Sequence, residues 1–191
     1  MGKKTAILGW GSLLWEANED FDLWHGPWQY DGPSLDLEFS RISQSRQGVL
    51  TLVIDSKSGS KIKAAYCWSN RPAPEDAISD LQYREGTTRR NIGYYCRDTN
   101  KINSRDEECR KEVVAWADSR NVDVVIWVDL PSNFEEKVGR QFSVSAAISY
   151  LKGLDATRKA KAFEYLRRAP SFVQTPLRKA LQAEPWFVED S

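Results

Sequence analysis

The strongest constraint on the fold is a change of hydrophobic period along this chain of 191 residues. Up to about residue 130 most apolar segments follow the strand period of two, whereas from Ser143 onward apolar residues recur every three or four positions, as in helices. Strands gathered first and helices last favour an α+β architecture over alternating βα units. We therefore expect a small mixed β-barrel or sheet flanked by helices, with a helical C-terminal segment.

Several segments of the first part read as strands. Residues 35–39 alternate between apolar and polar side chains, and residues 49–54 form the continuous apolar run of a strand buried on both faces. A turn that contains Gly59 leads from that run into residues 62–68, so we predict that these two segments pair as a hairpin. Further strands are expected at 5–8, 91–96 and 122–128.

Helical patterns complete the chain. Ile78 and Leu81, followed by the stop signal Gly86, describe a short helix over residues 75–85. A charged helical pattern covers residues 108–119. The C-terminal part carries two apolar stripes, Ala146, Ala147, Tyr150 and Leu151, then Ala162, Phe163 and Leu166.

The length and composition fit one domain over residues 1–191, with a strand-rich core at 1–130 and a helical extension at 131–191. The 27 basic and 27 acidic residues cancel, so no global field draws the protein to nucleic acid or to a membrane. The sequence has neither an apolar run of about 18 residues nor the apolar core of a signal peptide. We therefore expect a cytoplasmic protein with no membrane partner.

The cysteine and histidine counts exclude whole classes of site. Cys67, Cys96 and Cys109 are spaced too widely for a zinc site or a disulfide framework, so we expect reduced thiols. The single histidine, His25, excludes a His-rich metal centre and lies in an aromatic, turn-like segment that favours a structural role. Chemistry in this chain is therefore expected to use carboxylates, backbone amides or hydroxyls.

A glycine-containing loop, Gly9-Trp10-Gly11-Ser12-Leu13-Leu14, directly follows the first expected strand. It lacks the lysine of a phosphate-binding loop and the third glycine of a dinucleotide fingerprint. Its backbone N–H groups could instead hold a carboxylate or a developing oxyanion, because glycine lets the chain approach a ligand closely. The alternative is a tight turn between two apolar segments.

Glu85 is the most informative charged residue. With Ile78 and Leu81 it falls on the helix stripe that otherwise faces the core. The negative end of the helix dipole and partial burial both disfavour the charged form of this carboxyl, which suits a group that transfers protons. The alternative is a salt bridge with Arg84, Arg89 or Arg90.

Strand alternation, continued beyond Phe39, turns Arg41 onto the buried face, where its guanidinium would need an anionic partner such as a substrate carboxylate. Ser43 and Trp127 are further candidate pocket residues by the same alternation. The alternative is a β-bulge that exposes Arg41 and buries Ile42.

The stretch 152–179 holds eight basic residues against two acidic ones. Such an excess could bind nucleic acid, but it is more often the solvated face of amphipathic helices. We do not expect nucleic acid to be the partner.

Three motifs stand in order along the first two thirds of the chain: the loop Gly9-Trp10-Gly11-Ser12-Leu13-Leu14, the strand Phe39-Ser40-Arg41-Ile42-Ser43, and the helix end Tyr83-Arg84-Glu85-Gly86. Together they resemble the γ-glutamylcyclotransferase-like superfamily, over about residues 4 to 130. Members of that family have a small mixed β-barrel flanked by helices. The usual first residue of the loop motif is tyrosine, and here it is Trp10.

The resemblance implies roles for individual residues. Trp10, Gly11, Ser12 and Leu13 would hold the γ-glutamyl moiety of a small substrate, and Glu85 would be the catalytic acid and base. Glu85 would take a proton from the substrate's α-ammonium, the freed amine would attack the γ-carbonyl of the same molecule, and the leaving amine would receive the proton. The implied reaction releases 5-oxoproline and needs no metal or cofactor.

Two other functions stay open at this point. A module of the same fold could bind a small molecule without turnover, because a fold alone does not secure an activity. The basic C-terminal helices could also serve a nucleic-acid-binding protein. The amine of the substrate and the oligomeric state are not indicated by the sequence.

Overall fold

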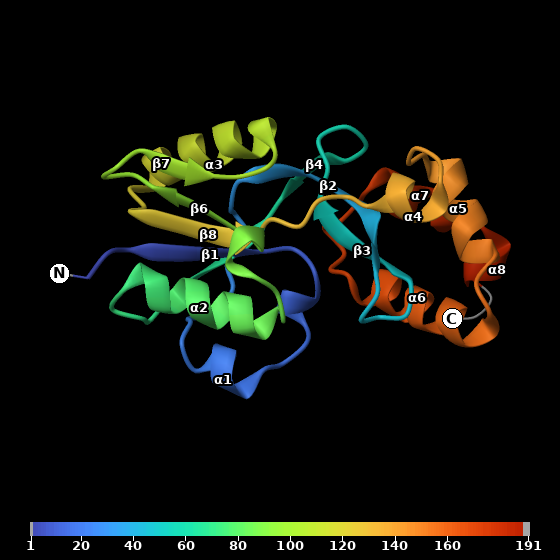
Figure 1. The fold of residues 1–191 in the computed structure, drawn as a ribbon, viewed down its shortest axis with the longest axis horizontal. Coiled ribbons are helices and arrows are strands. Elements are labelled where there is room, and N and C mark those ends of the chain that lie inside the picture. The colour runs from blue at the N-terminus through green and yellow to red at the C-terminus, as the bar shows by residue number, and fades with distance from the viewer. Residues whose placement is uncertain (1, 189–191) are drawn as a thin grey trace. The chain divides into compact units, whose positions relative to one another are not determined.

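The computed structural model describes residues 2–188, which group into two compact units (Figure 1). The first unit comprises the residues up to Leu35 together with Lys63–Leu130, and the second comprises Asp36–Ile62 together with the residues from Pro131 on. The division at residues 130 and 131 coincides with the expected start of the helical extension. Residues 36–62, however, group with that extension and not with the strand-rich core. That the chain acts as one domain stays a prediction.

The first unit is built on a five-stranded mixed sheet in the order β5-β1-β8-β6-β7. β1 pairs in parallel with the central β8 and antiparallel with β5, and β8 also pairs antiparallel with β6. This confirms the strands expected near residues 5–8, 91–96 and 122–128. The strands are β1 (Thr5–Gly9), β5 (Ala65–Trp68), β6 (Ile92–Cys96), β7 (Lys101–Asn103) and β8 (Val124–Val128).

Helices lie on both sides of this sheet, with α2 and α3 on opposite faces in Figure 1. Ile78 and Leu81 of α2 pack in one core with Ile7 of β1 and Ile126 of β8. Gly86 ends α2 with a φ of 55°, a conformation that glycine adopts without strain. The expected helices at 75–85 and 108–119 are therefore confirmed. The elements are η1 (Ser12–Leu14), α1 (Glu19–Asp22), α2 (Pro74–Arg84), η2 (Arg89–Asn91) and α3 (Glu107–Arg120).

A second sheet of three strands has the order β3-β2-β4, where β2 is Ser34–Ser43, β3 is Val49–Ile54 and β4 is Ser60–Lys63. Across the described residues 2–188 the strands form two sheets and no closed barrel, so the sheet, and not the barrel, is the form found.

The predicted hairpin between residues 49–54 and 62–68 is wrong. β3 and β4 pair with opposite edges of β2, and the chain then continues into β5 of the other sheet. The turn between them crosses close to β2: a Cβ on Gly59 would lie 2.8 Å from the backbone N and O of Leu37. The residues around Gly59 do form a turn, as the sequence indicated. This turn connects β3 with β4, which lie on either side of β2.

The second unit also contains the C-terminal helices. α6 packs on β3, and the apolar residues of the two predicted stripes are buried, among them Ala147, Leu151 and Phe163. The helical prediction for this part is confirmed. The helices are α4 (Phe134–Val138), α5 (Val144–Lys152), α6 (Ala156–Arg168), α7 (Pro176–Leu181) and α8 (Pro185–Val188). A membrane-spanning helix, long and apolar enough to cross a bilayer, is not found among residues 2–188.

Candidate functional site

The loop after β1 is a tight turn with a buried apolar lining. Gly9 stands where a Cβ would meet the Trp28 ring at 2.9 Å, so only glycine fits there without rearrangement. Trp10 and Leu13 are buried, and the short helix η1 follows at Ser12. The turn that the sequence left as an alternative is therefore present.

Within the same turn the carbonyls of Gly11 and Ser12 and the N–H of Gly11 differ in their backbone hydrogen bonds. The Gly11 carbonyl accepts from the N–H of Leu14 at 3.0 Å, and the Ser12 carbonyl accepts from those of Trp15 and Glu16 at 3.1 and 2.8 Å. Among the backbone hydrogen bonds of residues 2–188, none is donated by the N–H of Gly11. An N–H in this position can donate to an anionic oxygen of a ligand.

Glu85 lies directly after the last residue of α2. Its backbone N–H closes the helix on the Leu81 carbonyl at 3.1 Å, and its side chain is 20% exposed. The carboxylate therefore sits at the half-buried end of the stripe that begins with Ile78 and Leu81. The Arg84 Nη1 lies 3.7 Å from its Oε1, so the pairing with a neighbouring arginine is also present.

Arg84 connects Glu85 with the glycine-containing loop. Its side chain is only 9% exposed, and its Nη2 donates to the Glu16 carbonyl at 2.9 Å and to the Ser12 carbonyl at 3.5 Å. The Glu16 carboxylate lies 3.9 Å from the same nitrogen. One buried guanidinium thus contacts the loop and the Glu85 carboxylate. The sequence marked Arg84 only as a possible partner of Glu85.

The loop and α2 also share a hydrophobic core. Leu13 of the loop belongs to the same buried cluster as Ile78 and Leu81. Side chains packed in one core hold their backbones at fixed separations, because interiors are as dense as organic crystals. The loop amides and the Glu85 carboxylate therefore stand on a rigid common support.

Of the two alternatives that the sequence left open for Arg41, the β-bulge is the one found, and continued alternation is wrong. The register of β2 against β3 shifts between Glu38 and Arg41, and this bulge buries Ile42 at 7% exposure while Arg41 stays half-buried. Arg41 donates from Nη1 to the Pro131 carbonyl at 2.7 Å. The half-buried Ser43 has its Oγ 3.1 Å from that of Ser45. Arg41 and Ser43 belong to the second unit, and their role in substrate binding stays a prediction.

Trp127 does not line a pocket on the α2 side of the first sheet. Val124 and Ile126, its alternate neighbours in β8, pack with α2, so Trp127 projects from the opposite face. It is fully buried over Gly93, where an added Cβ would lie 2.2 Å from the indole ring. Strand alternation correctly places Trp127 on the face of β8 opposite to Val124 and Ile126. It could not show which of these two faces α2 covers.

His25 has the structural role that its segment suggested. Its ring packs between Phe21 and Trp28, with centroids at 4.8 and 5.4 Å. Its Nδ1 lies 2.7 Å from the Gly26 carbonyl oxygen, and its Nε2 lies 3.3 Å from the Asp22 carboxylate. Both ring nitrogens therefore have a partner within the turn.

The second unit contains a buried carboxyl that the sequence analysis missed. Glu38 in β2 is fully buried, and its carboxylate accepts from the N–H of Phe39 at 2.7 Å and of Leu177 at 3.1 Å. Burial raises the pKa of Glu38 to about 7, against the lowering effect of hydrogen bonds from Thr175 and from the two amides. Alternation placed Glu38 on the face of β2 opposite to Leu37 and Phe39, but it could not show that this face is also covered, here by the start of α7.

Several basic residues of the stretch 152–179 bind to groups of the second unit itself. Arg178 donates to several main-chain carbonyls, Arg158 pairs with Asp155 at 3.3 Å, and Lys161 donates to Gln47 at 2.7 Å. Burial lowers the pKa of Arg178. This arrangement favours solvated and capping roles for the stretch over one continuous nucleic-acid-binding face.

Neither a metal nor a known relative defines the site. Within residues 2–188 no group of three or more His, Cys, Asp or Glu side chains gathers in a way that could hold a metal ion. Comparisons of the chain with family models, curated proteins and solved structures give no match. Function must therefore be inferred from the residues themselves.

Proposed function

We propose that this chain is a γ-glutamylcyclotransferase-like enzyme that cyclises a small γ-glutamyl amine or peptide and releases 5-oxoproline. The observation that supports it most is the contact of the buried Arg84 guanidinium with both parts of the motif: the carbonyls of Ser12 and Glu16 in the loop, and the Glu85 carboxylate. The two motifs lie 72 residues apart in sequence, from Ser12 to Arg84. A contact between them is what a shared site requires.

In the proposed reaction Glu85 acts as base and then as acid. Its carboxylate takes one proton from the substrate's α-ammonium, and the freed amine attacks the γ-carbonyl carbon, forming the ring C–N bond. The bond from that carbon to the leaving nitrogen then breaks, and Glu85 returns the proton to the leaving amine. The second proton lost from the ring nitrogen passes to solvent, so atoms and charges balance.

The loop supplies binding and charge stabilisation. The N–H of Gly11 can donate a hydrogen bond to the developing oxyanion, and the buried Trp10 and Leu13 anchor the loop in the core. Because the nucleophile and the carbonyl belong to one molecule, the enzyme needs mainly to hold that molecule folded. A half-buried carboxylate and a rigid turn suffice for this task. A cytoplasmic location, and a reaction without metal or cofactor, belong to the same proposal.

The test is release of 5-oxoproline from a panel of γ-glutamyl peptides and γ-glutamyl amines by the purified chain. Glu85→Gln should lower the rate of release by at least about 10²-fold, because an amide cannot accept the proton. Glu75→Gln is the matched control, since this glutamate stands at the exposed start of the same helix and should leave the rate unchanged. Release at the wild-type rate in Glu85→Gln would refute the assigned role. A folded wild-type chain that binds panel members without turnover would favour a binding module instead.

A further inference from the structure

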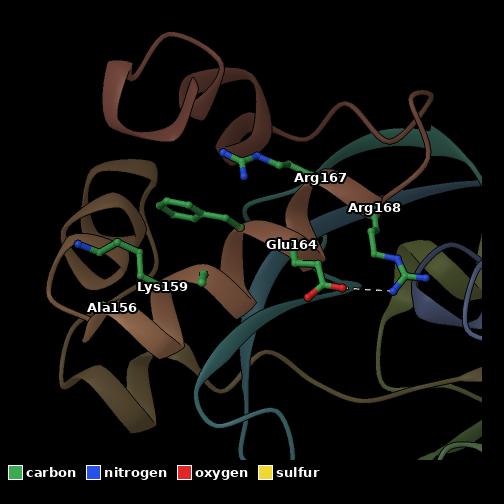
Figure 2. A pocket seen from close by; sticks show the side chains of 7 residues that line it. Ala156, Lys159, Glu164, Arg167 and Arg168 are labelled. Carbon is green, nitrogen blue, oxygen red and sulfur yellow. Dashed lines mark hydrogen bonds and ion pairs between the residues drawn. The ribbon is translucent and has the colours of Figure 1, made fainter. Parts of the chain in front are cut away.

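A hollow of about 700 Å³ lies along one face of α6 in the second unit (Figure 2). Within residues 2–188 its lining residues come from this one helix, at spacings of three and four that place them on a single face. The lining consists of Ala156, Lys159, Ala160, Phe163, Glu164, Arg167 and Arg168. Its volume falls within the range of about 300–1,000 Å³ that is usual for small-molecule sites.

The middle of this hollow is apolar. Ala156 and Ala160 are exposed and present only methyl groups, so they leave room beside the helix. Phe163 is buried and fixed by aromatic contacts with Trp186 and Phe187, at centroid distances of 5.3 and 5.0 Å. A flat apolar body can rest on such a surface without displacing a core side chain.

The rim of the hollow is cationic. Arg168 is neutralised by Glu164, with nitrogen and oxygen 3.3 Å apart. Arg167 donates to the Phe187 carbonyl, and its guanidinium lies 5.4 Å from the centroid of the Phe163 ring. The side chain of Lys159 has no hydrogen-bond or ion-pair partner among residues 2–188, and Figure 2 shows it and Arg167 extending from different positions along the helix. Three cations against one carboxylate leave a positive excess beside the apolar surface.

We propose that this hollow is a binding site for a small amphipathic anion, a molecule with an aromatic body and one sulfonate, carboxylate or phosphate group. The body rests on the exposed methyl groups of Ala156 and Ala160, beside the buried Phe163, and the anionic group meets the ammonium of Lys159. This site is independent of the function proposed above, since all of its residues belong to the second unit. Nucleic acid fits less well, because Arg158 and Arg178, which would extend a cationic track, are held by other groups.

A matched pair of fluorescent probes tests the proposal. 1-Anilinonaphthalene-8-sulfonate has an aromatic body and a sulfonate, and N-phenyl-1-naphthylamine has the same body without the charge. The full chain should bind the sulfonate at one saturable site, at least about tenfold more tightly than the neutral probe, and more weakly as salt is added. Equal affinity for both probes would overturn the proposal, since it would mean that apolar surface alone is recognised.

Variants locate the site. Lys159→Gln should weaken sulfonate binding about fivefold, the effect of one partly exposed charge contact. Arg158→Gln makes the same change of net charge at the neighbouring position outside the hollow and should leave the affinity unchanged. Equal effects of the two variants would overturn the proposal in favour of net charge alone.

A direct readout keeps the test independent of probe fluorescence and of folding. In a chain labelled at its alanine methyl groups, the sulfonate probe should shift the resonances of Ala156 and Ala160 and leave those of Ala146 and Ala147 in place. Ala160→Phe should fill the hollow and abolish the shift at Ala156, with the helical circular dichroism retained. Shifts confined to other alanines, or displacement of the probe by a short DNA duplex at equal site concentration, would contradict a small-anion site here.

Discussion

Two glutamates in the two units show opposite ways of holding a carboxyl. Glu85 in the first unit is 20% exposed at the end of a helix, and the Arg84 guanidinium lies 3.7 Å from its carboxylate. Glu38 in the second unit is fully buried, and within the described chain it has no cationic partner and is held by the amides of Phe39 and Leu177 and by Thr175. A carboxyl that exchanges protons with a substrate must be accessible to that substrate, whereas a carboxyl that links a strand to the start of a helix can be fully buried.

The difference also lies in what each carboxyl joins. Glu38 links β2 to the first turn of α7, where the main-chain N–H groups of a helix lack partners within the helix. Glu85 and Arg84 link α2 to a loop whose own turn is already closed by hydrogen bonds. The first arrangement stabilises the fold of its unit, and the second holds a 20% exposed carboxylate beside the loop.

The largest expected effect separates the two carboxyls by activity. Glu85→Gln should lower the rate of 5-oxoproline release by about 10²–10⁴-fold, the usual contribution of a positioned acid and base. Glu38→Gln, which makes the same chemical change at the sealed carboxyl, should keep the rate within about twofold while the fold is retained. Initial rates at saturating substrate, with circular dichroism of each variant, measure both. A larger loss of rate in a folded Glu38→Gln would break the comparison.

The second prediction concerns the pH dependence of stability. The folded pKa of Glu38, about 7, lies above its ordinary value of 4.5, so the unfolded chain binds fewer protons than the folded one between these values. This contribution to stability is complete below about pH 4.5 and is lost as pH rises through 7, by about 3 kcal/mol in total.

Urea unfolding at several pH values measures that loss, and Glu38→Gln is the control. The difference in the free energy of unfolding between the wild type and Glu38→Gln should change by about 3 kcal/mol across this window, because other titrating groups are common to both. A difference that stays constant from pH 4.5 to 8 would show that the carboxyl of Glu38 does not titrate in this range.

A smaller effect is expected at Thr175, which caps α7 and bonds to Glu38. The Thr175 Oγ1 accepts from the N–H of Arg178 at 3.2 Å, and its hydrogen bond to Glu38 lowers the pKa of that carboxyl. Thr175→Val removes the cap at nearly constant volume and should destabilise the chain by about 1–2 kcal/mol. It should also raise the pKa of Glu38 further, so the pH at which stability is lost moves upward. The same urea series measures both, and a midpoint that moves downward would contradict the assignment.

What the sequence predicted well was local. The helix before Glu85 and the strand before Gly9 follow from the spacing of their own apolar residues and from glycine at their ends, and both are found. The pairing of β4 with β2 depends on a turn that passes close to Leu37, a contact that no local pattern carries. The bulge in β2 likewise changes the face on which Arg41 lies.

The candidate site divides in the same way. The loop and Glu85 stand out in the sequence because glycines and a carboxyl at a core-facing position are unusual, and both motifs resemble those of a known family. Arg84 connects the loop with Glu85 by donating to main-chain carbonyls. Every residue has such a carbonyl, so the residue types in the sequence do not indicate which ones Arg84 contacts. This connection therefore became visible only with the structure.

The last and smallest prediction tests that connection. Arg84→Met removes the guanidinium and keeps much of the apolar stem, so the carbonyls of Ser12 and Glu16 lose a donor and Glu85 loses its nearest cation. If Arg84 acts by positioning, the rate of 5-oxoproline release should fall about tenfold, the scale of one charged hydrogen-bonding contact of about 1.5 kcal/mol.

Arg84→Lys is the matched variant, because it keeps the charge but lacks the planar fork that reaches the loop and Glu85 together. It should restore part of the rate, because a positive charge remains beside Glu85, but not the full rate, which depends on the contacts with the loop. Identical rates for both variants and the wild type would mean that Arg84 only fills space at the end of α2. Glu85 would then be positioned by the shared core of Leu13, Ile78 and Leu81 alone.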